Sequence, residues 1–401
     1  MGSFVVGLAS GLSQLGDRDE FVFVPYHGYE DWLRPYLEGR CRLITPPPEP
    51  SKTRALRDRM THAAKRRFAR YAESRGYEDR MVREIPRSDG AIEREGVEVI
   101  HLTQQWGFLT EVPTIYHPHD LQHLHYPDYF DRVEFDKREL YYRGLCAQAK
   151  AVAVSSNWTK NDLISAYGLP ADKIQVVPLA PLLGAYAEPD ADDITTVRGK
   201  FGLPESGFAF YPAQTWPHKN HIALLEALAR LKQDGLVIPF ISSGFKTEFC
   251  ATIEQRAREL GLGDQVRFLG FVSSLELQCL YRLSRCVVIP TKFESASFPL
   301  WEAFLAGTPA ACSTVTSLPE QAGDAALLFD PDDPEEIAAA VRSLWTDEAL
   351  RGTLISRGHE KVSRLSWPRT ARIFRALYRK TAGREIGSAD LALLAEADDS
   401  L

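Results

Sequence analysis

Short runs of β-branched and apolar residues alternate with longer amphipathic stretches along most of the chain. The runs predict strands at 20–25, 97–102, 113–117, 151–155 and 174–177, and then at 208–211, 236–242, 265–269, 286–290 and 308–312. Between 222 and 233, Leu224, Leu228 and Leu231 recur at the spacing of a helix that packs one face on a sheet. This alternation predicts an α/β protein with parallel sheets.

Two sets of strand and helix units are separated by residues 181–196, which are rich in Pro, Gly, Ala and Asp. We therefore predict an N-terminal domain at 1–185 and a C-terminal domain at 197–367. A last helix is expected from 368 to 380, and the segment 368–390 can pack back on the first domain. The acidic tail from Gly387 is expected to fray. Ligands of such sheets bind beyond the carboxyl ends of the strands.

Composition excludes several classes of protein. The 401 residues are 44% hydrophobic and 25% charged, which is too ordinary for a disordered or fibrous chain. No apolar run is long enough for a membrane-spanning helix, and the N-terminus does not resemble a signal peptide, so a cytoplasmic protein is expected. The net charge of −7 argues against nucleic-acid binding. Six cysteines without a Cys-x-x-Cys pair are expected to be reduced.

The acidic average conceals one basic segment. Residues 52–87 contain twelve Lys or Arg and five Asp or Glu, a local net charge of +7. Lys65, Arg66 and Arg67 lie beside apolar positions at helical spacing. Such a helix can lie on an anionic membrane or hold a diphosphate-lipid acceptor, and the alternative is a solvated helix that only packs its apolar stripe.

Two acidic residues follow the predicted strand at 286–290. Glu294 lies on the expected loop, and Glu302 lies eight positions later in the next helix. The small residues Ser295, Ala296 and Ser297 would let a ligand approach the helix N-terminus, where a phosphate or a polarised hydroxyl is favoured. We expect both carboxylates to reach one ligand. The alternative is a helix cap and a solvated surface residue.

A lysine follows the predicted strand at 208–211. Lys219 precedes the helix at 222–233, together with Gln214 and His218 in the same loop. A lysine at that place can neutralise a diphosphate leaving group as its negative charge develops, a role that a metal ion would otherwise fill. The alternative is an ordinary surface lysine.

Four of the ten histidines lie within 117–125, after the predicted strand at 113–117. His119 and His123, with Asp120 between them, imitate a His-Glu-x-x-His zinc site. That site needs a continuous helix and a third ligand. Pro118 argues against such a helix, and a metallohydrolase built on the two histidines is kept only as an alternative.

Residues 293–303 (FESASFPLWEA) resemble the Glu, seven residues, Glu motif of glycosyltransferase family 4, whose members are retaining enzymes of GT-B fold. Segments 266–272, 306–309, 318–320 and 323–329 extend the resemblance. It implies two facing Rossmann-like domains with a cleft between them. It also implies that Glu294 holds the donor sugar, that Glu302 holds the ribose, and that Ala296 to Phe298 lie near the sugar and the diphosphate.

The same resemblance implies the remaining site residues. Lys219 would bind the diphosphate, supported by Gln214 and His218, with Gly244 also in the donor site. His119 would contact the transferring sugar and Asp120 would orient it or the loop. The acceptor side would include His123, His125, Tyr126, Arg66 and Arg67.

The chain departs from the family pattern at several positions. Ser295 and Ser297 replace the usual glycines, and Ala213 stands where many members have an arginine. Family members begin with a strand and a Gly-rich turn, whereas Gly2 to Leu8 already match the turn and helix. The first strand is therefore expected to be missing, through a truncated start or a replacement of the leading residues.

These observations lead to one hypothesis. It is a metal-independent retaining glycosyltransferase, without a cofactor, that moves a mannose- or glucose-type hexose from a nucleotide diphosphate sugar. The acceptor would be a saccharide or a lipid-linked molecule in polysaccharide or glycoconjugate synthesis, with 52–87 at the inner face of a membrane. A non-catalytic GT-B protein that only binds nucleotide is the other alternative.

Overall fold

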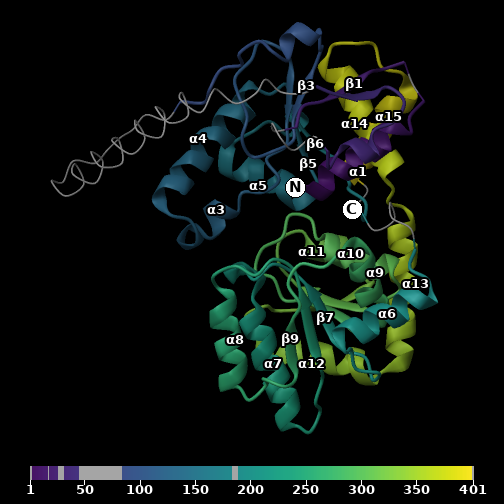
Figure 1. Ribbon diagram of the computed structural model, residues 1–401. Coiled ribbons are helices and arrows are strands. Elements are labelled where there is room, and N and C mark those ends of the chain that lie inside the picture. The colour runs from purple at the N-terminus through teal and green to yellow at the C-terminus, as the bar shows by residue number, and fades with distance from the viewer. Residues whose placement is uncertain (1, 17, 26–30, 45–83, 183–187, 400–401) are drawn as a thin grey trace, which may run out of the picture.

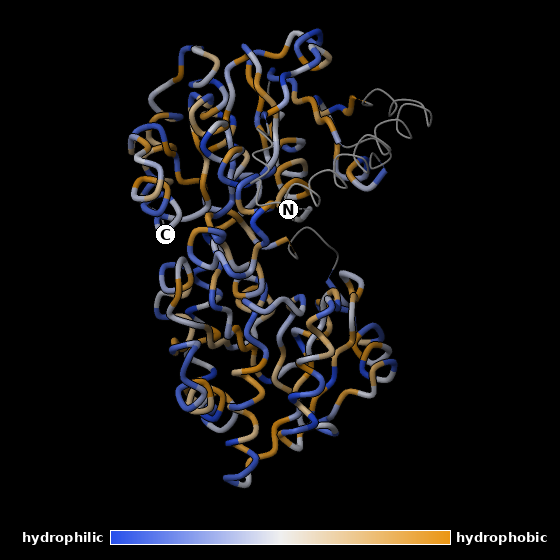
Figure 2. The backbone as a smooth tube through the Cα atoms, turned by 90° about the vertical axis from the view of Figure 1, so that its left-hand side faces the viewer, coloured by the Kyte–Doolittle hydropathy of each residue, from blue (hydrophilic) through white to orange (hydrophobic). Residues whose placement is uncertain are grey.

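The computed structural model describes residues 2–16, 18–25, 31–44, 84–182 and 188–399. Figure 1 shows two lobes, one above the other, and the last helices of the chain return to the upper lobe. Apolar segments run through the interior of each lobe, and polar residues predominate at the periphery (Figure 2). The strands are short and alternate with helices, which confirms the predicted α/β class.

The lower lobe is built on a six-stranded sheet in which every pair of neighbours is parallel. The strand order is β12-β11-β10-β7-β8-β9. The strands are β7 (Ala209–Pro212), β8 (Phe240–Ser243), β9 (Val266–Phe268), β10 (Cys286–Ile289), β11 (Ala310–Ser313) and β12 (Ala326–Phe329). All residues of β8, β10 and β11 are buried, because helices cover both faces of the sheet.

The helices of the lower lobe are α6 (Ala191–Phe201), α7 (His221–Gln233), α8 (Cys250–Glu259), α9 (Ser274–Leu283), α10 (Phe298–Leu305), α11 (Leu318–Ala322), α12 (Pro334–Thr346) and α13 (Glu348–Ser363). The helix predicted at 222–233 is confirmed as α7, and Leu224, Leu228 and Leu231 are fully buried. Helix α6 begins inside the stretch that was expected to be a linker, because Asp190 and Asp193 form a capping box at its start.

The upper lobe contains a four-stranded parallel sheet and a separate two-stranded parallel sheet. The first comprises β3 (Ile100–Leu102), β4 (Thr114–Tyr116), β5 (Ala151–Val154) and β6 (Ile174–Val176), and the second comprises β1 (Phe21–Phe23) and β2 (Cys41–Leu43). The helices are α1 (Gly2–Ser13), α3 (Gln122–His125), α4 (Arg132–Gln148) and α5 (Asn157–Tyr167). No strand of this part of the described chain joins the two sheets.

Two C-terminal helices lie on the upper lobe: α14 (Trp367–Thr381) and α15 (Ser388–Asp399). Helix α14 packs on α1, and Thr370 Oγ1 donates to the Pro178 carbonyl at 2.7 Å. The expectation of a frayed tail is wrong. Leu394 and Ala397 of α15 are buried, and Gln175 Nε2 donates to the Leu394 carbonyl at 2.9 Å, so the apolar positions of the tail fasten it to β6.

All ten predicted strands are present, whereas β2 and β12 were not predicted. All six cysteines are free, as expected from their spacing. Within the described ranges, no helix combines the length and the apolar composition needed to cross a bilayer.

Candidate active site

A cavity of about 330 Å³ opens at the carboxyl ends of β7 and β10 in the lower lobe. These strands are neighbours at the centre of the sheet, where the chain order reverses from β7-β8-β9 to β10-β11-β12. In open parallel sheets this reversal leaves a crevice in which ligands bind. The lining residues come from the loop after β7, the loop after β10 and the start of α10: Tyr211, Pro212, Ala213, Gln214, Trp216, His218, Lys219, Ile289, Glu294, Ser297 and Pro299.

The two charged residues of this cavity form an ion pair. Lys219 Nζ lies 2.6 Å from Glu294 Oε2, and the side chains are 20% and 15% exposed. Lys219 ends a short 3₁₀ turn, Pro217–Lys219, which Asn220 closes in a left-handed conformation with a φ of 57°. Asn220 Nδ2 donates to the Pro331 carbonyl at 2.8 Å, which holds this unusual residue in place. The lysine and the glutamate therefore lie together in one cavity, and their contacts with a donor stay predictions.

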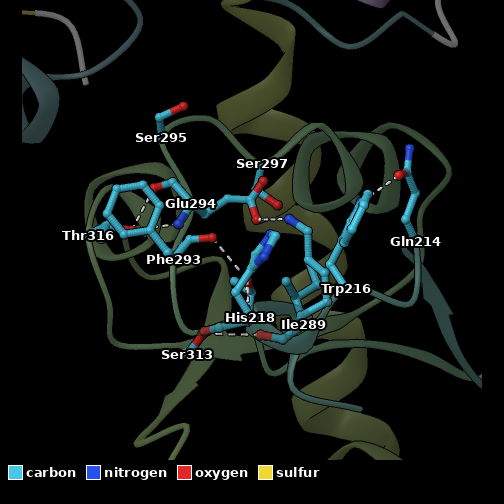
Figure 3. Close-up of polar contacts among 12 residues, drawn as sticks. Gln214, Trp216, His218, Ile289, Phe293, Glu294, Ser295, Ser297, Ser313 and Thr316 are labelled. Atoms are coloured by element: carbon cyan, nitrogen blue, oxygen red, sulfur yellow. Dashed lines mark hydrogen bonds and ion pairs between the residues drawn. The ribbon is translucent and has the colours of Figure 1, made fainter. Parts of the chain in front are cut away.

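The loop that carries Glu294 is fixed on both sides by hydrogen bonds from the start of α11 (Figure 3). Thr316 Oγ1 accepts from the Glu294 N–H at 3.1 Å and donates to its carbonyl at 2.5 Å. Ser317 Oγ donates to the same carbonyl at 2.9 Å. The buried Gln321 accepts from the Ser297 N–H at 2.8 Å. The backbone that would face a ligand is therefore preorganised.

The small residues of this loop take different positions. Ser297 is fully buried at the N-cap of α10, and its Oγ has no hydrogen-bond partner among the described residues. Because Ser297 also lines the cavity, a hydroxyl group is available to a ligand there. Ser295, Ala296 and Phe298 are half-buried but do not line the cavity, and the Ser295 carbonyl accepts a hydrogen bond from Ser155 Oγ of the upper lobe at 3.2 Å.

Glu302 lies in the second turn of α10, away from the cavity lining. The carboxylate is buried with 8% of the residue exposed, and Tyr281 Oη donates to Glu302 Oε2 at 2.8 Å. Burial raises the pKa of Glu302 to about 7, and the Tyr281 hydrogen bond opposes the shift. Glu294 therefore lines the cavity whereas Glu302 does not. The ribose contact implied for Glu302 stays a prediction.

The loop after β7 carries the other residues expected to bind the donor. Gln214 is exposed, and its Oε1 accepts from Trp216 Nε1 at 2.7 Å at the rim of the cavity (Figure 3). Burial, with the charge of Lys219, lowers the pKa of His218 to about 3, so this imidazole is neutral. Gly244 has a φ of 126°, and a Cβ there would lie 2.7 Å from the Ala213 carbonyl carbon. Gly244 thus supports the loop by close backbone contact.

His119 and Asp120 follow β4 in the upper lobe. His119 has a φ of 69°, stacks on His117 at a centroid distance of 4.4 Å, and its Nε2 lies 2.9 Å from the Thr103 carbonyl. Burial lowers the pKa of His119. Asp120 Oδ1 accepts from the Gln122 N–H at 2.9 Å, and Gln122 is the first residue of helix α3. Neither residue lines the cavity, so their sugar contacts stay predictions.

The residues expected on the acceptor side separate into three environments. His123 is buried and pairs with Glu139 at 2.9 Å, whereas His125 pairs with Asp162 at 2.9 Å. Tyr126 Oη donates to the Lys292 carbonyl at 3.0 Å and so bridges the lobes. Arg66 and Arg67, with most of the basic segment 52–87, lie outside the described residues.

The geometry gives the metallohydrolase alternative no support. Helix α3 begins only at Gln122, so His119 and His123 do not lie on one helix. In the ranges that the structure describes, no group of three or more His, Cys, Asp or Glu is arranged to hold a metal ion.

Sequence reasoning missed the residues that support the site. Thr316, Ser317 and Gln321 hold the Glu294 loop, and Tyr211 and Trp216 line the cavity. Tyr211 and Trp216 could have been found, since they flank the predicted lysine loop. The other three come from α11 and the turn before it, and only the fold brings them near.

Comparison with known proteins decides the family. A family model described as "Glycosyl transferases group 1" matches residues 193–361, and one described as "Glycosyltransferase Family 4" matches residues 21–180. The chain belongs to glycosyltransferase family 4. The O-antigen chain mannosyltransferase B of Escherichia coli is 30% identical to this family 4 chain. The match covers 62% of this chain and 65% of that relative.

Other relatives are more distant. The D-inositol 3-phosphate glycosyltransferase of Nocardioides sp. is 29% identical over 58% of this chain and 54% of that protein. The chain thus spans less than two thirds of either relative. Among solved structures, Anabaena HepE in complex with UDP and glucose superposes with a TM-score of 0.68 at 16% identity, covering 95% of this chain and 96% of that one. The fold of this family 4 protein is therefore GT-B.

Proposed function

We propose that the protein transfers a hexose of mannose or glucose type from a nucleoside diphosphate sugar to a hydroxyl of a saccharide or lipid-linked acceptor. The proposed reaction retains the anomeric configuration and uses no metal ion. The observation that carries the proposal is the Lys219–Glu294 pair in the cavity at the reversal point of the sheet.

Each member of this pair suits one half of such a donor. A carboxylate accepts two hydrogen bonds from neighbouring sugar hydroxyls, and an ammonium group neutralises the charge that develops on a departing diphosphate. The two side chains neutralise each other across 2.6 Å. A bound donor would replace this contact by one interaction with each side chain, and Ser297 Oγ would add a hydroxyl contact.

The relatives support the donor class. One relative is a mannosyltransferase of O-antigen chains, and the HepE structure contains UDP and glucose. Both point to a hexose carried on a nucleoside diphosphate, and the first points to polysaccharide synthesis.

The upper lobe is proposed to supply the acceptor side. Loops that follow β4 and β5 contact the loop that follows β10: Ser155 Oγ donates to the Ser295 carbonyl, and Tyr126 Oη donates to the Lys292 carbonyl. These contacts bring the carboxyl ends of the two sheets together beside Glu294. His119, Asp120 and His125 are proposed to complete the site from this side, and the basic segment to contact a lipid-linked acceptor.

A panel of UDP, GDP and ADP hexoses tests the proposal. Thermal shift identifies the base, because a ligand at 100 times its Kd stabilises by about 2.7 kcal/mol. Cleavage of the selected donor is then followed by NMR, with and without a chelator, to read the anomeric configuration and the metal requirement. Binding without cleavage or transfer would favour a nucleotide-binding protein. Wild-type rates in both Lys219→Ala and Glu294→Ala would exclude the proposed site.

A further inference from the structure

Phe293, the residue before Glu294, is buried between the two lobes. Only 4% of it is exposed, although it lies on the loop after β10 rather than in a strand or a helix. Among the described residues, Phe293 belongs to none of the hydrophobic clusters that form the cores of the protein. A ring that is buried outside these cores has to be covered by another surface.

The covering surface comes from the upper lobe and consists of three rings. The centroid of the Phe293 ring lies 5.5 Å from that of His125, 5.6 Å from that of Trp158 and 6.2 Å from that of Tyr126. His125 ends α3, Tyr126 follows it, and Trp158 lies in the first turn of α5. Trp158 and Tyr126 meet Phe293 at 84° and 85°, the edge-to-face arrangement that aromatic pairs prefer. We call His125, Tyr126 and Trp158 the aromatic pocket.

Hydrogen bonds from the upper lobe hold the loop on both sides of Glu294. Before it, Tyr126 Oη donates to the Lys292 carbonyl at 3.0 Å. After it, Ser155 Oγ donates to the Ser295 carbonyl at 3.2 Å. Contacts with the upper lobe therefore flank the glutamate that forms the ion pair of the cavity.

The ring of Phe293 and the carboxylate of Glu294 extend to opposite sides of the loop (Figure 3). The two residues share one rigid peptide unit, so a displacement of Phe293 moves the Glu294 main chain. Thr316 holds that main chain from within the lower lobe, through its N–H and its carbonyl. The aromatic pocket holds it from the other lobe, by way of Phe293.

We propose that Phe293 is a positioning residue for Glu294 and that the aromatic pocket of the upper lobe sets this position. With the ring in the pocket, the carboxylate is fixed at the cavity, where it can accept hydrogen bonds from sugar hydroxyls. Without the pocket, the loop gains freedom and the carboxylate loses its fixed place. Lys219 is carried by another loop, the one after β7, so its ammonium group remains available to a diphosphate when Phe293 is displaced.

The role given to Glu294 rests on the proposed function, whereas the coupling between Phe293 and the aromatic pocket does not. Trp158→Ala tests this coupling from the upper lobe. It removes a ring of the pocket but keeps the Trp158 N–H, which donates to Glu320 Oε1 of the lower lobe at 3.4 Å. Trp106→Ala is the matched control, because Trp106 is also a half-buried tryptophan of the upper lobe but packs on Tyr141, at a centroid distance of 5.1 Å.

Amide exchange reports the position of the loop without any substrate. The N–H groups of Glu294 and Ser297 donate to side chains outside the loop, so both are protected while the loop keeps its place. We expect Trp158→Ala to speed exchange in peptides spanning 293–297 by about tenfold or more, although the substitution lies in the other lobe. Trp106→Ala should leave this exchange unchanged. Equal exchange in the wild type and in Trp158→Ala would overturn the proposal.

Sugar transfer and binding of the free nucleoside diphosphate distinguish positioning from support of the fold. Phe293→Ala should lower transfer by about 10- to 10²-fold, since small displacements of a group in an active site have effects of this size. The Kd for UDP, GDP or ADP, whichever the thermal-shift panel selects, should stay unchanged. Phe293→Leu keeps an apolar side chain and should lose less transfer. If Phe293→Ala weakened diphosphate binding as much as transfer, Phe293 would only support the fold, and the proposal would be wrong.

The double variant Phe293→Ala/Trp158→Ala tests whether the two residues act as one unit. If Phe293 acts through the pocket, the double variant should transfer no more slowly than the slower single variant. Multiplying effects would overturn the proposal, because the two residues would then act independently. Faster exchange in Trp158→Ala together with a wild type that transfers no sugar would support the coupling and reject the proposed function, so the two failures are distinguishable. If Phe293→Ala does not fold, Phe293→Leu takes its place in each comparison.

Discussion

Lys219 Nζ lies 2.6 Å from Glu294 Oε2, although the two residues are 75 positions apart and follow different strands. The pair exists because β7 and β10 are neighbours in the sheet and both of their carboxyl ends lead into the same cavity. Each side chain is mostly buried, so removing one charge leaves the other without compensation.

Substitutions in this pair should have different effects on binding and on transfer. Lys219→Met should lower sugar transfer by about 10²–10³-fold and weaken binding of the free nucleoside diphosphate, because the ammonium group compensates the leaving group. Glu294→Gln should lower transfer to a similar extent but leave binding of the free diphosphate intact or stronger, since the lysine is then released. Calorimetric Kd values and initial rates provide the measurement.

Lys246→Met is the matched control for the lysine. Lys246 pairs with Glu254 at 3.3 Å, is 43% exposed and does not line the cavity. Its replacement should therefore change neither the Kd for the nucleoside diphosphate nor the rate of sugar transfer. Unchanged diphosphate binding in Lys219→Met would contradict the assigned role.

Gln321 should act on the donor through the loop that it holds. The Gln321→Leu variant loses the bond to the Ser297 N–H and leaves a buried donor unpaired, which costs about 1–3 kcal/mol. We expect a lower unfolding free energy together with a raised KM for the donor. Gln265→Leu serves as comparison, because Gln265 Nε2 donates to the Ile238 carbonyl in the same lobe but away from the cavity. Equal effects of both variants on KM would show that Gln321 is merely structural.

Gly244→Ala should disturb the loop after β7. The new methyl group would lie 2.7 Å from the Ala213 carbonyl carbon and oxygen, and the φ of 126° disfavours any side chain. Gly235→Ala isolates the backbone cost, since Gly235 has a φ of 83° with open space around its Cβ position. We expect Gly244→Ala to lower the Tm more and to weaken donor binding, while Gly235→Ala leaves binding unchanged. If Gly235→Ala lowered the Tm more than Gly244→Ala, the loop after β7 would be able to move away from the new methyl group near Ala213.

The elements that the sequence revealed are those with strong local signals. Most of the ten predicted strands are apolar runs that the parallel sheets bury, although β9 has Arg267 at its centre and β1 is only half-buried. The two strands that were not predicted have weaker patterns, because β2 contains a central arginine and β12 exposes Leu328. The tail was misread because its acidic and small residues suggest fraying. Only the fold shows that Leu394 and Ala397 find a surface on β6.

The candidate site divides in a similar way. The lysine and the glutamate follow strands and could be paired by topology before any coordinates were known. The burial of Glu302 under Tyr281 could not, because nothing local to either sequence segment indicates that α9 and α10 pack through these two side chains. Bonds from Thr316 and Gln321 likewise depend on tertiary packing.

Glu302 should make stability depend on pH in the direction opposite to that of most carboxylates. Burial raises its pKa from the usual 4.5 to about 7 in the folded protein. Between these two values the unfolded chain ionises while the folded chain keeps its proton, so stability falls as pH rises through this window and levels off above about 7. A shift of this size corresponds to about 3 kcal/mol. Glu302→Gln keeps an acceptor for Tyr281 but does not ionise.

Urea unfolding of both proteins at pH 5 and pH 8 measures this contribution. Buried histidines such as His221, whose pKa burial lowers to about 3, destabilise the fold as pH falls. Their contribution is present in both proteins and cancels in the difference. We therefore expect Glu302→Gln to be more stable relative to the wild type at pH 8 than at pH 5. A difference in unfolding free energy that stays constant between the two pH values would mean that Glu302 ionises as freely as it does in water.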